Sequence, residues 1–277
     1  MSDRLRFLAR PSALVGAALL ALIVGIALFG PFFSPDPPDR PVGVPFERPS
    51  AAHLLGTDFL GRDVLSRVLW GGRSVLALAG LATALAYVLG AAAGLVAGYV
   101  RGWLDGLLMR GADVLLSFPA LLFILVVVTG AGTSKTVLVA TVAAVQLPLI
   151  ARIVRTATLE QSVRGFVEAA EARGDRWSQI LRREILPNIA TPIMADLPLR
   201  FTYSIILVAS VNFLSLGLQP PAADWGLMIS ENRDGLTLNP YVILVPAALI
   251  ALLTIAVNLV GDSVARTLGR SGVRGVA

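Results

Sequence analysis

The sequence is poor in reactive and charged side chains. Its 277 residues include no cysteine, one histidine and one lysine, and only 15% are charged. The absence of cysteine excludes a disulfide framework and a thiolate metal site. The single histidine, His53, excludes the His-Glu-x-x-His zinc motif and leaves no nucleophile–histidine set. We therefore expect that this protein is not an enzyme and has no catalytic, metal-binding or cofactor-binding residues of its own.

The one lysine lies in a glycine-rich stretch, "GAGTSKT" at 130–136, with a weak likeness to a nucleotide-binding loop. Such a loop requires glycine directly before the lysine. Here Ser134 precedes Lys135. We interpret the stretch as a turn between two apolar segments, and we expect no ATPase site in this chain.

Long apolar runs make up most of the chain, and the mean hydropathy is +0.76. A run of about 20 apolar residues crosses a bilayer as a helix. None of the runs shows the alternation that is typical of barrel strands. We predict an all-α polytopic membrane protein with six transmembrane helices, close to Ala13–Phe33, Val75–Tyr99, Leu107–Val128, Thr136–Val154, Pro192–Leu216 and Pro240–Val260.

The first apolar run follows three arginines and resembles a secretory signal. A cleavable signal has an apolar core of about 7–15 residues and ends in small residues. This run is longer and ends in Gly30-Pro31-Phe32-Phe33. We interpret 1–12 as a cytoplasmic N-terminus and 13–33 as a retained first transmembrane helix.

The orientation follows from the arginines, because cytoplasmic loops carry an excess of positive charge. They concentrate in the N-terminus, in the segments after the second and fourth runs, and in the tail: Arg4, Arg6, Arg10, Arg101, Arg110, Arg152, Arg155, Arg164, Arg173, Arg176, Arg182, Arg183, Arg266, Arg270 and Arg274. With six spans these segments share one side, so we expect both the N-terminus and the tail at 263–277 to be cytoplasmic. The pI near 10.4 then reflects topology, and we expect no nucleic-acid partner.

The segment 34–74 is expected on the outer side, and it changes character along its length. Its first part is rich in proline, which favours a stiff, non-helical chain. Its second part pairs Val64 with Val68 and Leu65 with Leu69 at helical spacing, with arginines between them. That pattern predicts a short helix in the membrane interface, anchored by Trp70. The alternative is an N-terminal extension of the second span.

The membrane segment 75–262 contains glycines and prolines at informative positions. Gly90, Gly94 and Gly98 recur at four-residue spacing, which allows two helix backbones to approach closely. The prolines of the last three spans, Pro148, Pro198 and Pro246, each remove a backbone hydrogen bond and favour a kink.

Asp196 and Arg200 are two opposite charges in the fifth run, four residues apart on one helix face. Ionisable groups inside a membrane usually face a cavity or a partner. One interpretation is that they line a solute path. The other is that the fifth span begins later and that both lie near the cytoplasmic headgroups.

The segment 155–192 is the longest cytoplasmic loop in this topology. Phe166–Arg173 is rich in alanine and charge, which favours a helix. Gly174 ends this helix, and we expect Asp175 to cap a second one that stops near Pro187. The result is a protruding helical hairpin, with Ala169 and Ala170 on a smooth face for another protein.

The hairpin resembles the EAA loop of bacterial ATP-binding-cassette (ABC) importer permeases, and the residues that carry this resemblance are Glu168, Ala169, Ala170, Gly174, Ile185, Leu186 and Pro187. The stretch "HLLGTDFLGRDVLSRVLWGGRSVL" resembles the dipeptide, oligopeptide and nickel permeases. So do "SFPALL" at 117–122, "LSLGLQPPAADWGLMI" at 214–229 and "NLVGDSVA" at 258–265. These ordered matches cover nearly the whole chain and indicate a C-type permease. Glu184 departs from the usual isoleucine two residues before the Leu-Pro pair, which leaves the packing of that turn open.

The resemblance implies a type I ABC importer permease fold in the bacterial cell membrane and transport by alternating access. It implies a B-type permease partner, two ABC ATPase subunits that bind the ATP, and an extracytoplasmic solute-binding protein, all in contact with membrane lipid. The hairpin would couple the ATPases to the spans. Peptides are the expected solute, with nickel chelates, glutathione and oligosaccharides as alternatives.

An ion-coupled secondary transporter is the rival interpretation. It would normally need intramembrane carboxylates and often shows inverted repeats. Asp196 is the only candidate carboxylate well inside a run, and we find no repeat.

Overall fold

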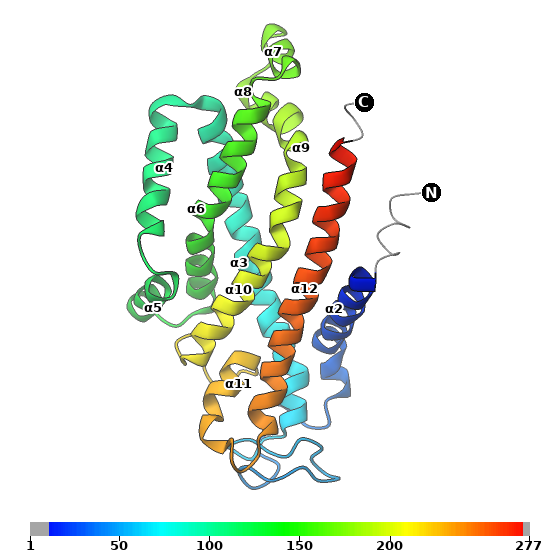
Figure 1. Cartoon of the computed structure of the whole chain (residues 1–277). Helices are drawn as coiled ribbons and strands as arrows, with labels where there is room; N and C mark the ends of the chain where they lie inside the picture. The colour runs from blue at the N-terminus through cyan, green and yellow to red at the C-terminus, as the bar shows by residue number, and fades with distance from the viewer. Residues whose placement is uncertain (1–10, 274–277) are drawn as a thin grey trace.

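The computed structural model describes residues 11–273, and within them all regular secondary structure is helical apart from two isolated bridges (Figure 1). Arg4, Arg6, Arg10 and Arg274, which were used to predict the orientation, lie outside the described residues. In the described part, five helical segments are long and apolar enough to cross a membrane. They are α2 (Pro11–Phe29, extended by the 3-10 turn Gly30–Phe33), α3 (Val64–Val100), α6 (Lys135–Gln161), α10 (Ala190–Phe213) and α12 (Tyr241–Val273).

The third predicted span is broken. Instead of one helix over Leu107–Val128, the chain forms α4 (Gly102–Leu116) and α5 (Ala120–Ala131), which are bent by 89°. The break falls at Ser117-Phe118-Pro119, because proline disfavours the helical conformation of the residue before it. The expectation of a continuous helix here was therefore wrong. Taken as one span, the bent pair gives the predicted sixth crossing.

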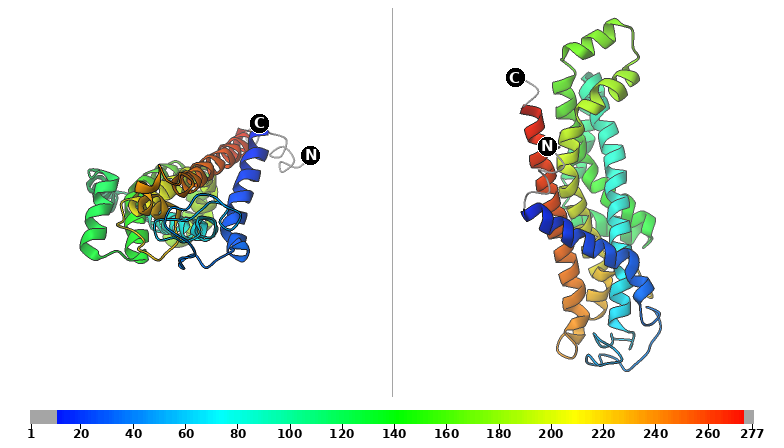
Figure 2. Two further views of the ribbon diagram at one scale, coloured as in Figure 1. Left: turned by 90° about the horizontal axis from the view of Figure 1, so that it is seen from below. Right: turned by 90° about the vertical axis from the view of Figure 1, so that its right-hand side faces the viewer.

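Figure 1 shows the long helices side by side, with connecting segments at two opposite ends. One end carries α7 (Gly165–Ala172), α8 (Trp177–Ile180) and α9 (Leu186–Asn188), and we call it the hairpin end. The other carries the non-helical segment 34–63, which we call the lid, and α11 (Trp225–Glu231). Helix α2 lies obliquely across the outside of the bundle, where it packs on α12 and α3 (Figure 2).

The residues expected to form an interfacial helix are the first turns of α3. Asp63 caps this helix, since its Oδ2 accepts a hydrogen bond from the Ser66 backbone N–H at 2.7 Å. Val64 and Val68 are buried against Trp225, whose indole N–H donates to the Val68 carbonyl at 2.9 Å. The apolar face therefore packs on protein. This corrects the expectation of a separate helix and agrees with the alternative of an extended second span.

The glycine ladder of α3 packs against α6, as the spacing predicted. A Cβ atom on Gly94 would lie 2.5 Å from the carbonyl oxygen of Ala151, and one on Gly90 would lie 2.9 Å from that of Leu147. A Cβ atom on Gly98 would lie 2.8 Å from the carbonyl oxygen of Arg155 and 2.7 Å from the Cβ of Thr158. The two helices therefore approach closely at three successive turns, and their contact is the most extensive between any two helices of the described residues.

The three prolines at which we expect kinks lie inside the helices α6, α10 and α12. Pro198 packs directly on the backbone of Gly261, where an added Cβ would lie 2.4 Å from the Pro198 Cβ. Gly261 belongs to the "NLVGDSVA" stretch of α12, so this glycine serves close packing between α10 and α12.

Candidate functional site

The hairpin has a glycine turn between its two arms. Gly174 adopts φ +79°, a left-handed conformation that favours glycine. The turn closes with two backbone bonds, from Gly174 N–H to the Glu171 carbonyl at 2.9 Å and from Asp175 N–H to the Ala170 carbonyl at 3.1 Å. Since nothing lies within 4 Å of a Cβ built on Gly174, backbone conformation rather than space demands glycine here.

Only part of the predicted alanine face is exposed. Ala169 is open, as is Glu168, whereas Ala170 is fully buried. Ala170 belongs to a cluster with Val167, Ile180 and Ile185 that holds the two arms together. The expectation of a smooth face made by both alanines was therefore wrong, because one of them faces the second arm of the hairpin. Leu186 and Pro187 are exposed on that second arm.

Asp175 does not cap the second arm, which corrects another expectation. Its carboxylate instead accepts a hydrogen bond from Arg173 Nη2 at 2.8 Å. The arm begins at Trp177 after Arg176, whose backbone N–H donates to the Gln179 side chain at 3.1 Å. Glu184 lies 3.4 Å from Arg173 Nη2. The acidic residue that departs from the family pattern thus pairs with a basic residue on the facing arm.

A π-helical turn, η2 (Leu181–Ile185), joins α8 to α9. The backbone N–H of Leu186 donates to the Leu181 carbonyl, five residues back. Pro187 has no N–H to donate, and the side-chain amide of Asn188 donates to the Glu184 carbonyl at 2.6 Å. The wider turn thus accommodates the proline within a helix that continues toward α10.

One side-chain hydrogen bond connects the hairpin to the end of α3, and a second connects the end of α3 to the end of α6. The Tyr99 hydroxyl at the end of α3 donates to Glu171 at 2.7 Å, and Arg101 donates to the Ser162 hydroxyl at 2.9 Å. An open cleft of about 800 Å³ lies between these segments, and Glu168, Glu171 and Trp177 contribute to its lining. The hairpin therefore stands on the end of α3 as well as on α6.

Asp196 and Arg200 form a pair, as their spacing predicted. Arg200 Nε lies 3.0 Å from Asp196 Oδ2, and the Tyr87 hydroxyl of α3 donates to the same oxygen at 2.8 Å. The two side chains are only 13% and 11% exposed. The pair lies in the first half of α10 and links it to α3.

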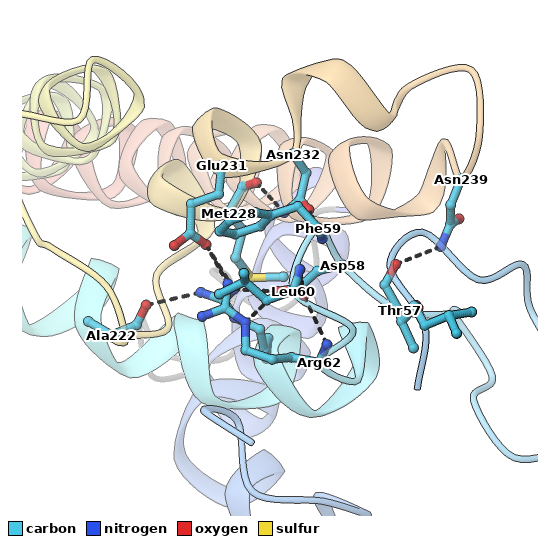
Figure 3. Close-up of polar contacts among 12 residues, drawn as sticks. Thr57, Asp58, Phe59, Leu60, Arg62, Ala222, Met228, Glu231, Asn232 and Asn239 are labelled. Carbon is cyan, nitrogen blue, oxygen red and sulfur yellow. Dashed lines mark hydrogen bonds and ion pairs between the residues drawn. The ribbon is translucent and has the colours of Figure 1, made fainter. Parts of the chain in front are cut away.

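At the opposite end, four charged side chains are buried together. Asp58 Oδ2 accepts from Arg62 Nε at 2.7 Å and from Arg67 Nη1 at 2.6 Å. Glu231 Oε2 lies 3.2 Å from Arg62 Nη2 and 2.8 Å from Arg67 Nη1 (Figure 3). All four side chains are at most 6% exposed. We call this set the outer network, and it ties the lid to α3 and α11.

Two asparagines fasten the rest of the lid. Asn232 accepts from the Phe59 backbone N–H at 3.0 Å, and Asn239 donates to the carbonyls of Glu47 and Leu55 at 3.1 and 2.9 Å. Figure 3 shows Asn239 directed at the lid beside Thr57. The proline-rich segment is therefore a fixed cover over the ends of α11 and α12.

The signature at 214–229 forms the loop between α10 and α11 and the first part of α11. Asp224 accepts from the Asn212 side chain at 2.9 Å and from the backbone N–H groups of Gly226 and Leu227 at 2.9 and 3.2 Å. Asn212 in turn accepts from the Leu218 N–H at 2.9 Å. Complete burial raises the pKa of Asp224 to about 6. The hydrogen bonds lower the pKa but offset only part of this effect.

Neither the outer network nor the hydrogen bond between Asn212 and Asp224 is predicted from the sequence. The equal numbers of arginine and acid in 34–74 were a signal for pairing inside the lid. Glu231, however, lies 169 residues after Arg62, and no local pattern connects them.

Comparison with known proteins agrees with this architecture. Residues 90–271 match the family model of the binding-protein-dependent transport system inner membrane component. Residues 4–53 match the N-terminal TM domain of oligopeptide transport permease C.

Two relatives are similar over nearly their whole length. The glutathione transport system permease protein GsiD of Pectobacterium atrosepticum is 36% identical over 261 residues, which span 93% of this chain and 86% of the relative. A putative peptide transport system permease protein of Brucella suis biovar 1 is 33% identical over 258 residues, which span 93% of this chain and 87% of the relative.

Among solved structures, an inward-facing conformation of the MetNI methionine ABC transporter superposes with a TM-score of 0.58 at 18% identity. The match covers 73% of this chain and 96% of that chain, and it shows a shared fold. The family matches and the full-length relatives decide the assignment. The chain belongs to the binding-protein-dependent transport system inner-membrane components and is a C-type permease subunit of an ABC importer.

Proposed function

We propose that this permease forms half of the path for a small peptide or a peptide-like solute such as glutathione. The observation that carries the proposal is the similarity over 93% of the chain to permeases named for glutathione and for peptide transport. A B-type permease chain would supply the other half of the path.

The hairpin is the proposed docking site for an ABC ATPase subunit. Its exposed residues Glu168 and Ala169 stand beside the turn at Gly174, and a buried apolar cluster keeps the arms rigid. A rigid hairpin transmits a displacement to the helices that flank it, here α6 and α10. ATP binds to the partner ATPases in this proposal, since the stretch at 130–136 lacks the glycine that a phosphate loop requires.

This role assigns the hairpin end to the cytoplasm and the lid end to the outside, where a solute-binding protein would dock. Arginines support the same orientation, because they concentrate in the segments of the hairpin end. Asp196 and Arg200 are proposed to line the solute path, because charges within a span usually face a cavity or a partner.

The first experiment is a pull-down of the tagged chain in mild detergent, with mass spectrometry of the retained proteins. We expect a nucleotide-binding ATPase and a second permease. The purified complex is then reconstituted in proteoliposomes with its binding protein, and ATP-dependent uptake of glutathione and of dialanine is measured. Recovery of the chain alone, with uptake that needs no ATP, would overturn the proposal.

A further inference from the structure

Helices α4 and α6 carry an ion pair on the outer surface of the chain, within segments that are apolar enough to span a membrane. Arg152 of α6 pairs with Asp113 of α4, and their side chains are 49% and 59% exposed. By helix rise, Arg152 lies roughly 14 Å from the end of α6 at Gln161, and Asp113 roughly 17 Å from the start of α4 at Gly102. Both residues are therefore remote from the hairpin end of their helices, and Asp113 lies three residues before the end of α4 at Leu116, beside the break in the third span. Since Asp113 also falls inside the third predicted run, Asp196 is not the only carboxylate well inside a run.

The pair belongs to two rows of exposed residues that are polar except for Gly106, and Ser117 in the first row is the residue directly after α4. On α4, the exposed residues Gly106, Arg110, Asp113 and Ser117 recur at spacings of four, three and four. On α6, the exposed residues Arg152, Thr156 and Glu160 recur every four residues toward the hairpin. We call these seven residues the polar seam.

Next to the seam, α4 exposes apolar residues that lie three, four and seven positions from Arg110 and therefore border it. They are Trp103, Leu107 and Val114, which are exposed at 78%, 59% and 60%. These residues suit lipid. Exposed charges deep in lipid are unfavourable, so the polar seam must meet water or protein instead.

A second ion pair joins the same two helices. Arg155 holds Asp105 through two hydrogen bonds, at 2.5 and 2.6 Å, and both residues are less exposed than the Asp113–Arg152 pair. The Asp105–Arg155 pair joins α4 to α6 by itself. Asp113 and Arg152 are thus available for another task than holding the two helices together.

We propose that the polar seam lines the aqueous solute path and that Asp113 and Arg152 are a transient binding site for a zwitterionic solute. A solute carboxylate would exchange for Asp113 on the Arg152 guanidinium, and a solute ammonium group would exchange for Arg152 on Asp113. Because the pair and a dipeptide zwitterion such as dialanine each carry one positive and one negative charge, the exchange leaves no charge unpaired; glutathione would bring a second carboxylate that this pair does not bind. The inference rests on the proposed function, since peptides and glutathione carry both groups.

The absence of cysteine from the chain allows a direct test of solvent access. Single-cysteine variants Ser117→Cys, on the seam, and Val114→Cys, among the apolar residues that border it, are prepared in the complete complex in proteoliposomes. A charged, membrane-impermeant maleimide is applied from either side. We expect Ser117→Cys to react and Val114→Cys to stay unreacted, although Val114 is closer to the hairpin end and depth therefore cannot explain the difference.

The solute site is tested by uptake. Asp113→Asn and Arg152→Gln should each lower uptake of dialanine roughly tenfold at an equal amount of assembled complex, because each variant loses one charge-assisted contact. N-acetyl-dialanine amide, which lacks both charges, should not compete with dialanine. The matched control is the exposed pair Asp262–Arg266 at the end of α12, whose neutralisation should leave uptake unchanged.

The outcomes are separable. A Ser117→Cys variant that reacts only in the isolated chain would overturn the proposal, because the seam is then an interface with another subunit. The proposal would also be overturned if Ser117→Cys reacted neither in the complete complex nor in the isolated chain. The same holds if Arg152→Gln takes up dialanine at the wild-type rate. If the wild-type complex transports neither dialanine nor glutathione, the proposed function fails, while the maleimide pattern still decides whether the seam is in water.

Discussion

Arg67 Nη1 lies 2.6 Å from Asp58 Oδ2, and neither side chain has any exposed surface. A buried charge is tolerated only when it is paired, and removing one partner leaves the other uncompensated. Here Asp58 pairs with two arginines, and Glu231 of α11 supplies the second negative charge that balances them. The relationship fixes the lid to the start of α3.

We expect Asp58→Ala to lower the free energy of unfolding by about 3–5 kcal/mol, because two arginines would lose a buried partner. Thermal unfolding of the purified complex in detergent measures this. Asp262→Ala, which removes an exposed carboxylate, should change stability by less than about 0.5 kcal/mol. Equal stability of the two variants would refute a structural role for the outer network.

Glycine packing between α3 and α6 can be tested within a single helix. Gly94→Ala should destabilise the protein by about 1–3 kcal/mol, since the added Cβ would lie 2.5 Å from the Ala151 carbonyl oxygen. Gly80→Ala, where nothing lies within 4 Å, should stabilise α3 by up to about 1 kcal/mol through helix propensity. Melting temperatures of both variants decide the matter, and a stabilising Gly94→Ala would contradict the close approach.

The hairpin turn offers a second glycine comparison. Gly174→Val should strain the left-handed turn by about 1–2 kcal/mol and reduce solute-stimulated ATPase activity while the chain stays in the membrane. Gly165→Val is the control, because that site also has open space but no positive φ. Glu168→Lys should uncouple transport without any change in stability, since its side chain is exposed. Normal transport by both Gly174→Val and Glu168→Lys, with ATPases bound, would refute the coupling role.

Asp224 predicts a pH dependence of stability. Burial raises its pKa from 3.8 to about 6 in the folded protein, so the folded state binds the proton more tightly than the unfolded state. Its contribution to stability is therefore fully present below about pH 4 and is lost as the pH rises to about 6, by roughly 3 kcal/mol in total. Asp224→Asn keeps an oxygen for its three donors and should remove this part of the pH dependence. The test is the difference between wild-type and variant melting temperatures from pH 4 to 7, and a constant difference would contradict the prediction.

Asp196 is proposed to line the solute path together with Arg200. If it lines the path, Asp196→Ala lowers uptake at a constant amount of assembled complex, measured by ATP-dependent transport in proteoliposomes. Tyr87→Phe is the matched control, because it removes one hydrogen bond from Asp196 at 2.8 Å and leaves the charge. Unchanged uptake in Asp196→Ala would instead indicate a purely structural pair between α3 and α10.

Local composition was enough to identify a helical membrane protein, the approximate spans, the glycine ladder and the hairpin at 165–188. These features depend on periodicity and on single residues whose preferences act locally, such as Gly174 at a positive φ. The resemblance of ordered motifs identified the family. The bend at Pro119 also has a local cause, the proline itself. A count of apolar residues, however, cannot distinguish a straight span from one bent by 89°.

The contact partner of each polar or small residue depends on how distant segments pack together. Arg62 and Glu231 are far apart in the chain, and their pairing depends on how α11 packs against α3. Ala170 is buried and Ala169 exposed because the second arm folds back over one of them. Which segments are helical and apolar follows from local sequence alone, because backbone hydrogen bonding in a membrane is satisfied within each helix. Packing between helices, which depends on side chains from distant segments, decided the lid, the outer network and the polar seam.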